Sequence, residues 1–113
     1  MSEQRDRVYL QDILESVEAV EDYVADQEFQ DFQRDRKTVS ATIREFQIIG
    51  EAIGNLSEEL KNRHSTVLWQ DIRDFRNKLV HEYFGVDLEI VWNTIHGDLP
   101  ELKNQVEGIL HLR

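Results

Sequence analysis

"TIREFQIIGEAIGNLS", residues 42–57, carries the clearest helical pattern of this 113-residue chain. Its large apolar side chains recur every three or four residues, which places them on one face of an α-helix. The same spacing continues on both sides and predicts one long helix over residues 36–62. The side chains expected on its buried face are Val39, Ile43, Phe46, Ile49, Ile53, Leu56 and Leu60.

Two glycines, Gly50 and Gly54, lie one turn apart inside this predicted helix. Each costs about 1 kcal/mol relative to alanine in a helix interior. Either the two small residues let another helix approach closely, or the helix tolerates a weak point. The sequence leaves both interpretations open.

Helical spacing also runs through the rest of the chain. It predicts a helix over 4–26 capped by Ser2, a short helix or turn over 26–35 that buries Phe29 and Phe32, and helices over 67–83, from Asp87 to Gly97 and from Asp98 to about 112. The side chains expected to face inward from the first helix are Val8, Ile13, Leu14, Val17, Val20 and Val24. Those expected to face inward from the helix over 67–83 are Leu68, Trp69, Ile72, Phe75, Leu79 and Val80.

Five glycines and one proline leave few turns for a β architecture. We therefore expect a single domain over residues 1–113, an all-α bundle of four main helices plus short helices.

Composition limits the classes of function. The net charge of −10 argues against a generic nucleic-acid binder, because phosphate contacts need clustered cations. The acidic residues concentrate in 3–31, whereas 61–81 is locally basic, and any contact with RNA is expected from Lys61, Arg63, Arg73, Arg76 and Lys78. The chain has no cysteine, no signal-peptide pattern and no apolar run long enough to span a bilayer. We expect a cytoplasmic protein that makes no membrane contact.

No sequence motif indicates a metal or a cofactor. The four histidines are 15 to 17 residues apart, so none of the short metal-ligand spacings occurs. "HEYFG" at 81–85 lacks the second histidine of the zinc-protease pattern, and "GEAIGN" at 50–55 lacks the lysine and the preceding strand of a phosphate loop. We expect neither a metal nor a cofactor.

The stretch "RNKLVHEYF", residues 76–84, combines residue types that suit phosphodiester chemistry. The guanidinium of Arg76 can hold phosphate oxygens, and His81 can exchange a proton with a ribose 2′-hydroxyl, which would make the substrate RNA. On a regular helix these two side chains diverge by about 140°. Either the helix ends at His81, or two copies of the helix face each other in a homodimer. Alternatively, Arg76 pairs with a surface carboxylate, His81 caps a helix end and Tyr83 is a half-buried aromatic.

Arg76, His81 and Tyr83 also match the R-x4-H-x-Y signature of the HepT-like toxins in the HEPN superfamily. The resemblance covers nearly the whole chain. It includes "RDRVYLQDILESVEAVEDYV" at 5–24, "TIREFQIIGEAIGNLS", "LWQDIRDFRNKLVHEYFGVDLEIVW" at 68–92 and "DLPEL" at 98–102.

The resemblance implies an all-helical, HEPN-like homodimer in which two motif helices line a shared cleft. It implies a metal-independent ribonuclease that serves as the toxin of a toxin–antitoxin system, with Arg76 and His81 catalytic and Asn77 supporting. Tyr83 would accept AMP from a cognate, MntA-like nucleotidyltransferase antitoxin. The charge and bulk of the added nucleotide would then block RNA. Two other readings stay open: a catalytically silent HEPN module that binds a nucleotide or a nucleotidyltransferase partner, and a purely structural dimeric bundle.

Overall fold

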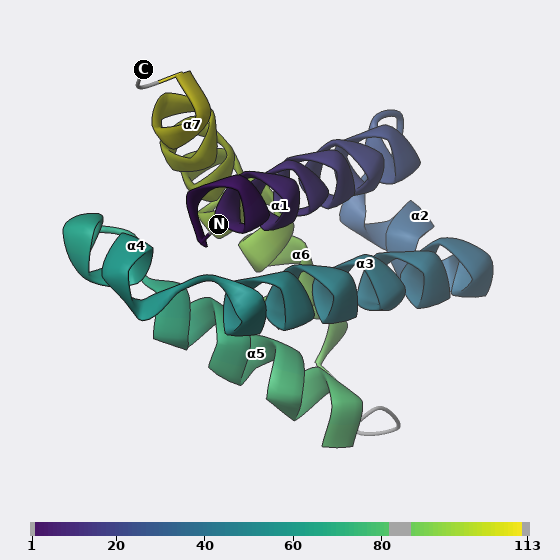
Figure 1. Ribbon diagram of the computed structural model, residues 1–113. Helices are drawn as coiled ribbons and strands as arrows, with labels where there is room; N and C mark the ends of the chain where they lie inside the picture. Colours follow the sequence, from purple (N-terminus) through teal and green to yellow (C-terminus); the bar gives the residue numbers. More distant parts are fainter. Residues whose placement is uncertain (1, 82–86, 112–113) are drawn as a thin grey trace.

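The computed structural model describes residues 2–81 and 87–111, in which every regular element is an α-helix (Figure 1). Four helices are long and three are short, which confirms the predicted all-α bundle. They are α1 (Ser2–Val24), α2 (Phe29–Arg34), α3 (Arg36–Asn55), α4 (Glu58–Arg63), α5 (Trp69–His81), α6 (Leu88–His96) and α7 (Asp98–His111). None of the described helices is long and apolar enough to cross a membrane.

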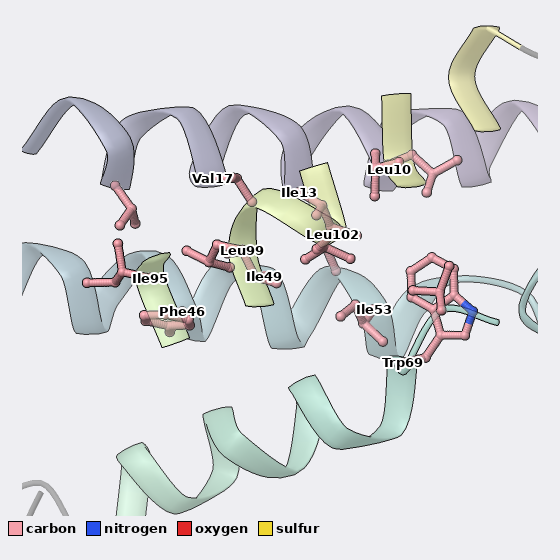
Figure 2. Packing of buried hydrophobic residues seen from close by; sticks show 14 of the residues in the cluster. Leu10, Ile13, Val17, Phe46, Ile49, Ile53, Trp69, Ile95, Leu99 and Leu102 are labelled. Carbon is pink, nitrogen blue, oxygen red and sulfur yellow. The ribbon is translucent and has the colours of Figure 1, made fainter. Parts of the chain in front are cut away.

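The core lies between α1 and α3 and is closed by α6 and α7, whereas α5 packs on the other side of α3 (Figure 1). Figure 2 shows Ile13 of α1 and Ile49 of α3 reaching toward each other, with Leu99 of α7 in the same cluster. All three side chains are at most 1% exposed. Because α3 contacts both α1 and α5, it links the core to the helix that carries Arg76 and His81.

Two residues predicted to face inward are exposed instead, so the prediction was wrong for them. Val8 is 57% exposed, and the neighbouring Leu10 occupies the core position on α1. These two residues are about 200° apart around the helix, so they cannot share a face. Leu68 is 58% exposed because α5 begins only at Trp69, whose buried indole Nε1 donates to the carbonyl of His64 over 3.1 Å.

The predicted long helix over 36–62 is divided in two, a second correction. Its first part, α3, ends at Asn55, and α4 begins after Ser57, whose Oγ caps it by accepting from the amide of Leu60 at 3.1 Å. The carboxylate of Asp6 accepts two hydrogen bonds from Ser57, at 2.8 Å from its amide and 2.6 Å from its Oγ. Asp6 is only 4% exposed, so this contact from α1 fixes the break inside the protein.

Both ends of α6 agree with the sequence. The predicted cap Ser2 is instead the first residue of α1, which ends at Val24. Asp87 is the N-cap of α6, since its carboxylate accepts from the amide of Glu89 at 2.9 Å, and Gly97 is the C-cap. Asp35 caps α3 through the amide and hydroxyl of Thr38, and these hydrogen bonds lower the pKa of the Asp35 carboxyl. The C-terminal end of the helix predicted over 67–83 lies outside the described residues.

Gly50 and Gly54 are where α5 approaches α3. A Cβ at Gly50 would lie 2.5 Å from Cγ and 2.6 Å from Cβ of Arg76, distances that real side chains do not adopt. A Cβ at Gly54 would lie 3.2 Å from the guanidinium of Arg73, the far end of a flexible side chain. The interpretation that the glycines let another helix approach closely is therefore correct, and at Gly50 the contact leaves no space for a Cβ.

We predict that Asp6→Ala lowers the free energy of unfolding by about 1–3 kcal/mol, because it removes the acceptor of the partly buried amide and hydroxyl of Ser57. Urea unfolding at fixed protein concentration measures the loss. Glu3→Ala, an exposed carboxylate on the same helix, is the matched control and is expected to change stability by less than about 0.5 kcal/mol. Equal effects of the two substitutions would contradict the role given to Asp6.

Gly50→Ala and Gly54→Ala are expected to have opposite effects on stability. Both remove a helix-interior glycine, a gain of up to about 1 kcal/mol. At Gly50 the new methyl would meet the Cβ of Arg76, which no rotamer change can move, so α5 must shift at a net cost of about 1–3 kcal/mol. Thermal and urea unfolding compare the variants. If Gly50→Ala proves as stable as Gly54→Ala, the close contact does not exist.

Candidate active site

Arg76 is the best-defined part of the motif. Its Nη1 donates to Oδ1 of Asn77 over 2.8 Å, and no other hydrogen bond joins this guanidinium to the described residues. Its Nε is buried without a hydrogen-bond partner there. The described part of the chain also places no carboxylate within ion-pair distance of Arg76. The guanidinium keeps capacity for an anion that the described residues do not supply.

The position of Arg76 follows from the packing of α5. The preceding residue, Phe75, turns into the bundle and meets Phe46 of α3 edge to face, with ring centroids 5.2 Å apart. The aliphatic stem of Arg76 then lies on the surface that Gly50 leaves open. Since both contacts are with α3, the backbone of α5 has little freedom to rotate beneath the guanidinium.

The other motif residues are placed only in part. His81 is the last residue of α5, and its side chain is not described. Tyr83 lies outside the described residues. Arg76 and His81 stand five positions apart in one helix, an angular separation of about 140°, so one copy of α5 does not by its regular geometry direct both at the same atom.

The cations predicted to contact RNA fall into two groups. Arg73 is exposed one turn before Arg76, and Lys78 is exposed further along α5. Lys61 is instead paired with Glu58 at 3.1 Å, and its side chain is only 15% exposed. Arg63 borders a separate cavity with Asp6 and other residues near the start of α1. The structure brings Arg73 close to Arg76, but it holds the two α4 cations elsewhere.

Sequence reasoning missed a cleft of about 300 Å³ beside Arg76. Tyr9 and Asp12 of α1 line it, together with a row from α3 and Arg76 itself; the α3 residues are Arg44, Gln47, Ile48, Glu51, Ala52 and Asn55. The sequence feature that could have indicated this cleft is the recurrence of polar residues every three or four positions in the long helix. That pattern also describes a solvated face, so the sequence alone does not distinguish the two.

The described ranges 2–81 and 87–111 contain no candidate metal site. No group of three or more His, Asp or Glu side chains there is close enough to hold an ion. What the described geometry offers is a positioned guanidinium beside a polar cleft. Such a group can bind the non-bridging oxygens of a phosphodiester and neutralise charge that develops on them.

Known proteins resemble this chain over most of its length. The family model described as "Ribonuclease HepT-like" matches residues 13–109. Over 104 residues the chain is 44% identical to "Putative RNase TTE0752" of Caldanaerobacter subterraneus subsp. tengcongensis, covering 92% of this chain and 93% of that protein. It is 41% identical over 101 residues to "Probable ribonuclease HepT" of Thermococcus cleftensis, covering 89% and 92%.

No solved structure matches the chain. The family match spans most of the sequence, including all of α5 and its motif, and the two relatives align over nearly their full lengths. On this evidence the chain belongs to the ribonuclease HepT-like family of the HEPN superfamily.

Proposed function

We propose that this protein is an RNA endonuclease toxin that cuts without a metal ion, in a homodimer that brings together two copies of Arg76 and His81. A cognate, MntA-like nucleotidyltransferase antitoxin would switch it off by transferring AMP to Tyr83. The observation that carries the proposal is Arg76, whose aliphatic stem packs on Gly50 and whose guanidinium donates to Asn77, with no carboxylate partner among the described residues. The family and the names of the relatives support the choice of RNA.

The reaction needs only groups from the protein and the substrate. One His81 imidazole takes the proton of the ribose 2′-hydroxyl, and the oxygen forms a bond to the adjacent phosphorus. The bond from phosphorus to the 5′-oxygen breaks, and a second, protonated imidazole gives that oxygen its proton. The products are a 2′,3′-cyclic phosphate and a 5′-hydroxyl. Arg76 holds the non-bridging oxygens throughout, where its charge stabilises the transition state.

The geometry of α5 supports the proposed homodimer. Acid and base must stand on opposite sides of the phosphorus, yet one chain has a single His81 at the end of this helix. A twofold axis beside α5 would provide the second imidazole and a second guanidinium, and twofold dimers are the commonest symmetric assembly.

One prediction from this proposal concerns catalysis. The purified protein is expected to cut single-stranded RNA in EDTA, and Arg76→Met and His81→Ala are each expected to slow cutting by about 10²–10⁴-fold. Methionine keeps an apolar stem on Gly50, so the variant tests the guanidinium and not the packing. Gel assays of a labelled RNA, with detection of the cyclic phosphate end, provide the measurement.

Arg34→Met is the matched control, because Arg34 is exposed on the short helix α2. It is expected to cut at the wild-type rate. Folding of each variant is checked by circular dichroism. Normal cutting by both motif variants would show that the site is misassigned, and a folded wild type that never cuts would favour the silent binding module.

The second prediction concerns Tyr83. With the cognate nucleotidyltransferase, ATP and Mg²⁺, the protein is expected to gain AMP, seen by mass spectrometry, and to lose RNA cutting. Tyr83→Phe is expected to accept none. Tyr23→Phe is the control: its hydroxyl donates to Glu45 over 2.7 Å, which raises the pKa of Tyr23, and it is expected to be modified like the wild type. AMP found on Tyr83→Phe would refute the assigned acceptor.

A further inference from the structure

The cleft beside Arg76 has the composition of a site that reads a nucleobase. Tyr9, half-buried on α1, supplies an aromatic ring, and Ile48 and Ala52 of α3 supply apolar surface next to it. Unpaired bases of RNA are bound by stacking on aromatic side chains and by hydrogen bonds to their edges. A volume of about 300 Å³ is at the small end of ligand pockets, which fits one nucleotide and not a duplex.

The polar groups of the cleft form one ridge along α3. Arg44, Gln47, Glu51 and Asn55 follow at intervals of three or four residues and therefore share one face of the helix. Amides bind adenine through paired hydrogen bonds, carboxylates accept from the amino group of cytosine, and arginine donates to guanine. The ridge thus presents both donors and acceptors to the edge of a base.

Cations flank the aromatic ring. Arg44 and Arg76 both line the cleft, and neither has an ion-pair partner within the described part of the chain. The guanidinium of Arg5 lies 6.0 Å from the centroid of the Tyr9 ring, at the outer limit of a cation–π contact. Asp12 and Glu51 offset part of this charge, so the cleft does not resemble a simple polyanion groove.

We propose that this cleft binds one unpaired nucleotide of the RNA substrate, next to the phosphate held by Arg76, and so determines which sequences are cut. The inference rests on the proposed nuclease function and adds a specificity subsite to it. Tyr9 stacks on the base, Gln47 and the neighbouring polar groups of α3 contact its edge, and Arg76 joins the subsite to the reacting phosphate.

The test maps cut sites on a library of short, unstructured RNAs. Tyr9→Leu removes the aromatic ring but keeps apolar bulk, and Gln47→Ala removes an amide. Each is expected to lower kcat/KM on the preferred sequence by about 10-fold to 100-fold, the range for loss of one stacked base or one base contact. The wild-type preference at one position beside the cut is expected to weaken with them, a change that a purely structural defect does not produce.

Two controls accompany these variants. Tyr9→Phe keeps the ring and is expected to retain the preference, and Gln33→Ala, an exposed amide on α2, is expected to cut like the wild type. If Tyr9→Leu and Gln47→Ala keep the wild-type pattern and kcat/KM while the wild type cuts RNA, the subsite is refuted and the nuclease function stands. Free AMP, GMP, CMP and UMP are also tested as inhibitors of cutting. Inhibition by one of them at a concentration as low as that at which the RNA binds would assign the cleft to a free nucleotide and refute the RNA subsite.

A wild type that does not cut RNA would refute the nuclease function, and binding then tests the cleft separately. Wild type and Tyr9→Leu are titrated with the four nucleoside monophosphates and with a fluorescent, unstructured RNA. Binding of the RNA that weakens in Tyr9→Leu would support the cleft as a nucleotide site without catalysis. Equal binding by both proteins, or none, would refute it.

Discussion

The contact of the Arg76 stem with Gly50 is the constraint on which the candidate site depends. A glycine inside α3 is unfavourable for the helix, yet any larger residue would occupy the space of Arg76 Cβ and Cγ. The helix therefore gives up part of its intrinsic stability so that α5 can lie against it. Phe75 fixes the same turn from the core side through its contact with Phe46. Together these contacts fix the backbone that carries Arg76 to the face where the cleft opens.

The hydrogen bonds that Ser57 donates to Asp6 fix the part of the chain that precedes α5. They end α3, start α4 and tie both to α1. The chain then reverses, and the indole of Trp69, hydrogen-bonded to the carbonyl of His64, begins α5 from a buried position. Because α5 starts at this anchor and lies on Gly50 two turns later, its path along α3 is determined at two points. The loss of either would move Arg76 relative to Tyr9 and Arg44.

Local patterns predicted most of this fold, because apolar periodicity and caps are properties of neighbouring residues. The all-α bundle, the start of α6 at Asp87 and its end at Gly97 were all readable. The break at Ser57 was not, since it depends on Asp6, 51 residues away, and without that carboxylate the apolar spacing runs on to Leu60. Val8 and Leu68 were misplaced for a related reason: apolar type suggests burial, but the register of each helix decides it. For the site, the roles of the motif residues stay predictions. The cleft was not predicted, because Tyr9 and Arg76 line one cavity only through the packing of α1, α3 and α5.

The net charge of −10 poses a problem for any protein that handles RNA, and the described structure indicates how the problem is limited. Arg44 of α3 lines the same cleft as Arg76, and Arg73 lies one turn before Arg76 on α5. Lys61, which the sequence also offered, is paired with Glu58. Affinity from phosphate contacts alone would therefore be low and sensitive to salt. Base stacking and contacts to base edges do not depend on counterion release. They would therefore add more affinity to such a site than further positive charge would. For such a protein an acidic surface restrains indiscriminate binding to nucleic acid, and under the proposed subsite it leaves the choice of substrate to the few contacts of the cleft.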